Sequence, residues 1–386
     1  MAQHLRRNTC KHLPQVGEVN YIKDIVLKLK EEKMNYRNSL FTNTAIALFL
    51  SLLVACSDDD NSAASSAKSE KNEKDIPTII LDTDIGSSTD DLFALQSLYR
   101  CHQAKTCNFI GVIVDRMGEN NAAITDVMNT YYGMGDLPIG LERNGIKEPK
   151  VWIDYAELPA DTNADGSEMF KRTVKDYSKV LDGYKLYRKL LAEQPDHSVS
   201  LVSTGFVTTL ANLLNSKADD YSNLSGVELV KAKVKTLYVV GGVFGDAVEP
   251  DYNFTQAIDF SLDFFKLWPV EVPRVFSPGE VGDGIEYVPE QVIEDISWTD
   301  THPIKQVYMN NECHTGQKMW DVMAVLNAVQ GDSLFQFSDN GRVSIDEKGI
   351  TTFTKDAKGN DRYQRPNDTE WNNRILQEIR KETKEH

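Results

Sequence analysis

The stretch that decides the fold is residues 76–91, which read Ile-Pro-Thr-Ile-Ile-Leu-Asp-Thr-Asp-Ile-Gly-Ser-Ser-Thr-Asp-Asp. Residues 76–81 are apolar and largely β-branched, which predicts a buried strand. Residues 82–91 form a polar loop, and residues 92–99 have helical periodicity. A buried strand, a polar loop and a helix in this order predict the first unit of an α/β fold.

The same alternation continues outward along the chain. Further strands are predicted at residues 109–114, 199–203, 237–240 and 272–276. Helices are predicted at residues 122–132, 177–192, 208–215, 261–267 and 319–329. This order favours a mostly parallel, open sheet with helices on both faces. Residues 335–354 predict a short antiparallel addition near the C-terminus, and residues 369–385 a charged, peripheral helix.

The loop after the first strand is strongly acidic. Asp82, Asp84, Asp90 and Asp91 lie within ten residues, at the end of the strand where ligands bind in open parallel sheets. Carboxylates crowded in this way repel one another unless a cation neutralises them. Oxygen ligands in irregular geometry suit Ca²⁺ better than Mg²⁺. A solvated acidic loop is the simpler alternative, but it leaves the pattern DxDxG followed by DD unexplained.

This pattern resembles the signature of the nucleoside hydrolases, an aspartate cluster of the form DxDxG…DD after the first strand. Four later segments resemble landmarks of that family and occur in its order: Leu201-Val202-Ser203-Thr204-Gly205, Val239-Val240-Gly241-Gly242, Asp251-Tyr252-Asn253 and Trp320-Asp321. The resemblance covers roughly residues 76–330. Several short motifs in the right order carry far more weight than one.

The resemblance implies a role for each matching residue. Asp84, Asp91, Asp321 and the Thr204 carbonyl would bind Ca²⁺. Asp84 would also be the general base that deprotonates the bound water. Asp82 would support the site from behind. The residues that would bind the substrate are Asp90, Asn120, Asp251, Asn253 and Trp320. The expected activity is hydrolysis of the N-glycosidic bond of ribonucleosides.

Three departures from the family pattern matter. Trp320 stands before Asp321, where some members have a histidine as leaving-group acid, and a tryptophan there favours purine nucleosides through stacking. His314 is an alternative acid, and Trp152 an alternative stacking face. Asp251 replaces a glutamate and is one methylene shorter. The pair Asn120-Asn121 leaves the register of one ribose contact open.

Two other functions stay open at this stage. Asp82-x-Asp84 after a strand is also typical of haloacid-dehalogenase-type phosphatases, in which the first aspartate is the nucleophile. That family has Thr or Val where this chain has Gly86, and it leaves Asp90-Asp91 and Trp320-Asp321 without a role. The second alternative is a lipoprotein that binds calcium and a nucleoside or sugar without turning it over.

The first 75 residues predict export and anchoring. Residues 45–55 are apolar but too short to span a bilayer, which takes about 20 residues. They end in Leu53-Val54-Ala55-Cys56, which resembles a lipobox and predicts a lipidated Cys56. Residues 1–55 are therefore expected to be removed, with translation starting at Met34 rather than Met1. Residues 56–75 then tether a catalytic domain of residues 76–386 to the outer membrane.

Charge and cysteine content limit the remaining possibilities. The formal net charge is -16, which argues against nucleic acid as a partner because phosphate binding needs clustered Lys and Arg. The five cysteines show no zinc-type spacing. Cys101 and Cys107 are equally compatible with a disulfide and with free thiols. The resemblance implies a nucleoside as substrate and favours a homo-oligomer.

Overall fold

The computed structural model describes residues 76–146, 149, 154–310 and 316–384. Ile76–His386 forms a compact unit of its own. The predicted signal region, Cys56 and the tether lie outside the described residues, as do Trp152 and His314. Among the residues that are described, no helix is both long and apolar enough to cross a membrane.

The unit is built on an 11-stranded sheet in the order β12-β11-β13-β7-β6-β5-β1-β2-β3-β4, with β10 paired to β13. All pairs from β7 to β4 are parallel, which confirms the predicted fold class. These parallel strands are β1 (Thr78–Thr83), β2 (Asn108–Val114), β3 (Ile139–Leu141), β4 (Leu181–Asp182), β5 (Val199–Ser203), β6 (Val234–Val240) and β7 (Arg274–Ser277).

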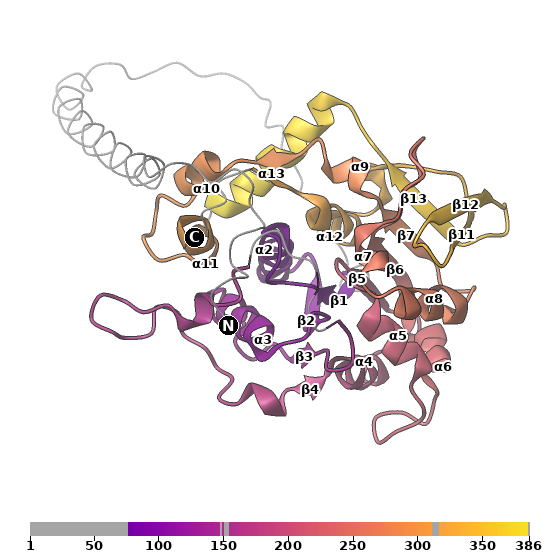
Figure 1. The fold of residues 1–386 in the computed structure, drawn as a ribbon, viewed down its shortest axis with the longest axis horizontal. Coiled ribbons are helices and arrows are strands. Elements are labelled where there is room, and N and C mark those ends of the chain that lie inside the picture. The colour runs from indigo at the N-terminus through magenta and orange to yellow at the C-terminus, as the bar shows by residue number, and fades with distance from the viewer. Residues whose placement is uncertain (1–75, 147–148, 150–153, 311–315, 385–386) are drawn as a thin grey trace, which may run out of the picture. The chain divides into compact units, whose positions relative to one another are not determined.

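Strand β1 is buried on both faces because it lies in the middle of the sheet. Ile79 and Leu81 pack into one hydrophobic core and Ile80 into the other, as the two-residue period of a strand requires. The core around Ile79 is covered by α2 (Asp90–Gln103), α3 (Glu119–Tyr131), α12 (Trp320–Gln330) and α13 (Thr369–Lys384). The core around Ile80 is covered by α4 (Gly183–Ala192), α5 (Thr208–Asn215), α6 (Gly226–Lys233) and α8 (Ile258–Leu267) (Figure 1).

The shorter elements complete the fold. They are α7 (Tyr252–Thr255), α9 (Gly279–Gly282), α10 (Pro289–Asp295), α11 (Pro303–Asn310), the pair β8 (Glu286–Tyr287) and β9 (Gln317–Lys318), and the 3-10 turns Leu158–Ala160, Tyr177–Lys179 and Asp332–Leu334.

The C-terminal addition is larger than predicted. Strands β11 (Gly341–Ile345) and β12 (Thr351–Lys355) form the predicted antiparallel pair. The sequence did not predict β10 (Gln336–Phe337) or β13 (Asp361–Arg365). Because β13 pairs in parallel with β7, the addition extends the main sheet instead of standing apart from it.

The helix predicted at residues 177–192 is wrong in its first third. The chain there forms a 3-10 turn and then the short strand β4, and α4 begins only at Gly183. The guanidinium of Arg143 donates hydrogen bonds to the carbonyls of Tyr177, Ser178 and Val180. These carbonyls therefore have partners outside any helix, and the backbone that follows is free to pair with β3.

Candidate active site

The acidic loop between β1 and α2 lies at the carboxyl edge of the sheet, where the sequence predicted a site. Gly86 has a φ of 115° there, a region that disfavours side chains. A Cβ at this position would lie 2.5 Å from Asn121 Oδ1 and 2.6 Å from Arg116 Nη1. The hydroxyl of Tyr155 donates to the carbonyl of Ser88 at 2.6 Å and its N–H to the carbonyl of Gly86 at 3.4 Å, so Tyr155 holds the loop at two points.

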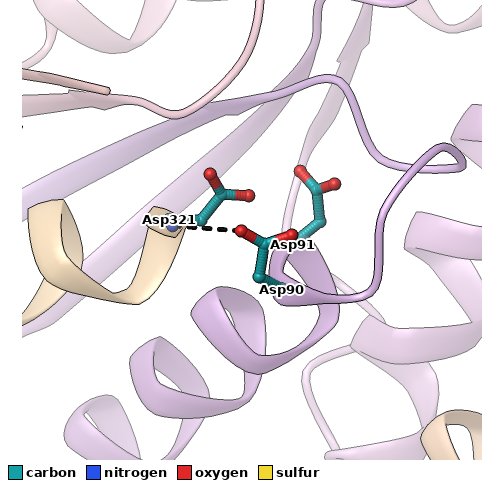
Figure 2. A group of neighbouring side chains, drawn as sticks. All are labelled: Asp90, Asp91 and Asp321. Carbon is teal, nitrogen blue, oxygen red and sulfur yellow. Dashed lines mark hydrogen bonds between the residues drawn. The ribbon is translucent and has the colours of Figure 1, made fainter. Parts of the chain in front are cut away.

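Asp90, Asp91 and Asp321 form a buried carboxylate cluster, with one oxygen of each within 4.8 Å of the others (Figure 2). Asp90 and Asp91 begin α2, and Asp321 lies in the first turn of α12. The backbone N–H of Asp321 donates to Asp90 Oδ2 at 3.3 Å. Both helix N-termini thus point partial positive charge at the cluster, which offsets a small part of its negative charge.

The cluster fits a cation better than any other group. Burial, and then the charges of neighbouring carboxylates, raise the pKa of Asp91 and of Asp321 well above the ordinary range. The hydroxyl of Thr83 donates to one oxygen of Asp91, but Asp91 Oδ2 has no hydrogen-bond partner among the described residues. Crowded, partly unpartnered carboxylate oxygens are the donor set that a hard divalent cation requires.

Asp84 lies beside this cluster but is not one of its three members. Burial first, and then the charge of Asp90, raise the pKa of Asp84 to about 7. The hydroxyl of Ser87 donates to Asp84 Oδ2 at 3.5 Å. Asp84 is therefore a buried carboxyl whose proton affinity is close to that of a useful base at neutral pH.

One cavity of about 250 Å³ brings most of the predicted residues together. Its lining includes seven predicted site residues: Asp84, Asp90, Thr204, Asp251, Asn253, Trp320 and Asp321. It also includes residues to which the sequence analysis assigned no role, namely Ser87, Ser88, Val240, Gly241, Tyr252, Gly279 and Asp283. The motifs that resembled one family in sequence therefore meet in space.

Asp251 and Asn253 are fixed by the start of α7. Asp251 accepts hydrogen bonds from the N–H groups of Gly242 at 2.9 Å and Phe254 at 3.1 Å, one on each carboxylate oxygen. The amide of Asn253 donates to the Thr204 carbonyl at 3.1 Å and to the Val240 carbonyl at 3.2 Å. The short Asp251 side chain thus caps the N-terminus of α7, and these two backbone N–H groups fix its orientation at the cavity wall.

Trp320 lies at another part of the cavity wall. Its indole N–H donates to Asp283 Oδ1 at 2.9 Å. Gly282 allows this approach, because a Cβ there would lie 2.6 Å from Trp320 Cδ1 and 2.7 Å from its Cα. The indole is only half-buried, so it is a wall of the cavity and not part of the core.

The remaining predicted residues lie outside the cavity lining. Asn120 is exposed and donates to Glu157 at 3.3 Å, whereas Asn121 is buried and donates to the Met117 carbonyl at 2.9 Å. Asp82 is fully buried and accepts a hydrogen bond from the Tyr187 hydroxyl at 2.8 Å. Cys101 and Cys107 are free thiols.

Asp115 and Arg116 are buried residues that the sequence analysis missed. They directly follow β2, at the same edge of the sheet as the acidic loop. Charges so placed after a buried strand were the signal that identified Asp82–Asp91, and the same signal could have found this pair. Arg116 lowers the pKa of Asp84, although burial outweighs it.

Several solved structures have a fold similar to that of this chain. An inosine-uridine preferring nucleoside hydrolase from Bacillus anthracis aligns with 15% identity and a TM-score of 0.59, over 80% of this chain and 100% of its own. The chain has the nucleoside hydrolase fold. A plant nucleoside hydrolase gives 15% identity, a TM-score of 0.58 and coverage of 80% and 99%. A purine-preferring ribonucleoside hydrolase from Gardnerella vaginalis gives 14%, 0.56, and coverage of 80% and 99%.

Sequence comparison alone does not find this relationship. No protein-family model matches the chain, and no curated protein matches it. At 14–15% identity the solved structures establish the nucleoside hydrolase fold, and the site must be argued from its own residues.

Proposed function

We propose that the chain is a calcium-dependent nucleoside hydrolase that cleaves the N-glycosidic bond of ribonucleosides to free base and ribose, with a preference for purines. The observation that carries this proposal is the cavity in which Asp84 lies beside the buried carboxylates of Asp90 and Asp321. It occupies the ligand-binding edge of a nucleoside hydrolase fold.

Ca²⁺ would be held by Asp84, Asp91, Asp321 and the Thr204 carbonyl, as the family resemblance implies. The raised pKa values of Asp91 and Asp321 and the unpartnered Asp91 oxygen support a cation at this place. When bound, such an ion lowers the pKa of a coordinated water toward neutrality. Asp90 belongs to the same cluster, so its proposed contact with a ribose hydroxyl would lie next to the ion.

The side chains of this chain divide the work of hydrolysis. Asp84 takes the proton of the attacking water, since its carboxyl lines the cavity beside the carboxylates of Asp90 and Asp321. Asp90 accepts a hydrogen bond from a ribose hydroxyl. Asn253 and Asp251, at the start of α7, contact other ribose hydroxyls. Trp320 stacks on the base, which accounts for the purine preference.

The proposal includes a location. Lipidation of Cys56 would anchor the enzyme in the bacterial outer membrane, where it would serve nucleoside salvage. The net charge of -16 supports a nucleoside rather than a nucleic acid as the substrate. A homo-oligomer is proposed from the family resemblance alone.

The decisive experiment is a reducing-sugar assay of the purified protein with a panel of ribonucleosides, in calcium and in excess chelator. We expect ribose release that depends on calcium and is faster with inosine and guanosine than with uridine. Tight nucleoside binding without ribose release would instead favour the binding lipoprotein. Release of phosphate from phosphate esters, without ribose release, would favour the phosphatase.

A further inference from the structure

The part of the cavity around Trp320 also contains Asp283, an acidic residue that no sequence motif predicted. Asp283 accepts the indole N–H of Trp320 at 2.9 Å, and both residues line the cavity. Asp283 follows directly on α9, whose Gly282 packs against the Trp320 backbone. The orientation of the indole is therefore fixed at its N–H edge by a carboxylate and by a close backbone contact.

The charge of the lining points to the kind of ligand that it accepts. The lining carries five carboxylates, those of Asp84, Asp90, Asp251, Asp283 and Asp321. Within the described part of the chain, no Lys, Arg or His belongs to that lining. A divalent cation and the buried Arg116, whose charge acts on Asp84, would offset part of this negative charge. An anionic ligand is disfavoured in such a cavity, and a cationic one is attracted.

We propose that the Trp320 end of the cavity binds a positively charged leaving group, so that cationic N-ribosides of the pyridinium type are substrates and Asp283 determines this specificity. The inference rests on the proposed function, because it names a substrate class for the same site. Tryptophan is the aromatic side chain with the strongest attraction for a cation over its ring. The Asp283 carboxylate, bonded to the ring N–H, adds negative charge beside that ring.

The chemistry of the leaving group agrees with this choice. The oxygen of water forms a bond to the anomeric carbon, and the electron pair of the C–N bond stays on the ring nitrogen. A pyridinium ring thereby leaves as a neutral pyridine, and the only proton to be placed is the one that water loses to Asp84. A neutral purine riboside needs a further proton on its base, whereas the pyridinium ring needs none.

The test compares a cationic with a neutral substrate in matched variants of the whole protein. Nicotinamide riboside is the cationic substrate and inosine the neutral one, and kcat/KM is measured for both. Asp283→Asn keeps an oxygen for the indole N–H but removes the charge, and Asp283→Ala removes both. Asp259→Asn makes the same chemical change at an exposed residue of α8 and is the control.

We expect wild type to prefer nicotinamide riboside, and Asp283→Asn to lower the ratio of the two kcat/KM values about tenfold, within the range of a cation–π contact. The control should keep the wild-type ratio. Binding of 1-methylnicotinamide, followed by calorimetry against neutral nicotinamide, should weaken in Asp283→Asn as well. This measurement does not depend on turnover.

Two results would overturn the inference and leave the proposed function standing. One is hydrolysis of inosine without any preference for the cationic riboside. The other is an unchanged ratio in Asp283→Asn together with a loss of both activities in Asp283→Ala, which would make Asp283 a support for Trp320 only. Failure to hydrolyse any nucleoside would overturn the proposed function and this inference with it.

Discussion

Asp84 is the single residue on which the proposed chemistry depends most directly, because it lines the cavity and is the proposed general base. Asp84→Asn keeps the shape of the side chain and one oxygen but cannot take a proton. Loss of a general base typically costs about 10²–10⁴ in rate. We therefore expect kcat to fall by at least that factor in steady-state assays at saturating calcium, while nucleoside affinity changes little. Turnover close to that of the wild type, at verified metal loading, would mean that another residue is the base.

The carboxyl cluster also predicts how pH and calcium act together on stability. Burial raises the pKa of Asp84 from 3.8 to about 7 and that of Asp90 to about 6, so the folded, metal-free chain holds these protons more tightly than the unfolded chain. Its free energy of unfolding should fall as pH rises from about 4 to about 7. Calcium replaces the protons and should raise Tm more at about pH 7.5 than at about pH 5.

Scanning calorimetry of wild type, Asp91→Asn and Asp321→Asn with calcium or chelator checks this expectation. At a hundredfold excess over Kd, a ligand specific for the folded state adds about 2.7 kcal/mol. The two variants should lose most of this gain, because each removes a charge from the cluster. Equal calcium effects at both pH values in wild type would contradict the assignment.

The site residues that could be predicted from sequence are those that short motifs carry. Asp84, Asp90 and Asp91 follow one strand, and Asp321 follows Trp320 at a helix start, so motifs that resemble the nucleoside hydrolases were enough to predict that these residues lie close together. Asp283 could not be found in this way. It reaches the site through a contact with Trp320, 37 positions away, and it directly follows a four-residue helix that no periodicity predicts.

At the scale of elements, α13 shows how a charged helix becomes part of the core. Trp371, Ile375 and Ile379 are buried along one face, and the Trp371 indole donates to the Leu334 carbonyl at 2.8 Å. Trp371→Ala should cost about 3–5 kcal/mol in the free energy of unfolding, as for other large core truncations. Urea denaturation measures this, with Arg374→Ala, an exposed residue of the same helix, as control. A cost below about 1 kcal/mol would show that α13 is dispensable.

Elements with a strong hydrophobic period were predicted well, and those fixed by tertiary contacts were not. Strand β5 (VSLVS) and helix α5 (TTLANLLN) have the predicted bounds, because apolar residues recur through each of them. Strand β4 was predicted as helix, since only the distant Arg143 and the edge of β3 make it extended. Strand β13 has polar residues at most positions and is placed by its pairing with β7.

At the scale of the whole molecule, the sequence before the compact unit predicts a mature protein that begins at a diacylated Cys56. Intact-mass analysis of protein extracted from membranes should show loss of residues 1–55 and the added mass of the lipid. Cys56→Ser should leave the protein unacylated and shift it to the soluble fraction. An unmodified wild-type protein, or one that retains residues before Cys56, would rule out this anchor.

The contact between the Asp321 N–H and Asp90 joins residues 231 positions apart. On a ribosome, which adds residues from the N-terminus onward, Asp90 and Asp91 emerge long before the helix that completes their cluster. The nascent chain consequently cannot assemble this cluster until α12 has been synthesised. Until then Asp90 and Asp91 remain hydrated and without Asp321. If the cluster binds calcium as proposed, loading would have to follow the synthesis of α12, and a chain terminated before α12 would lack the site.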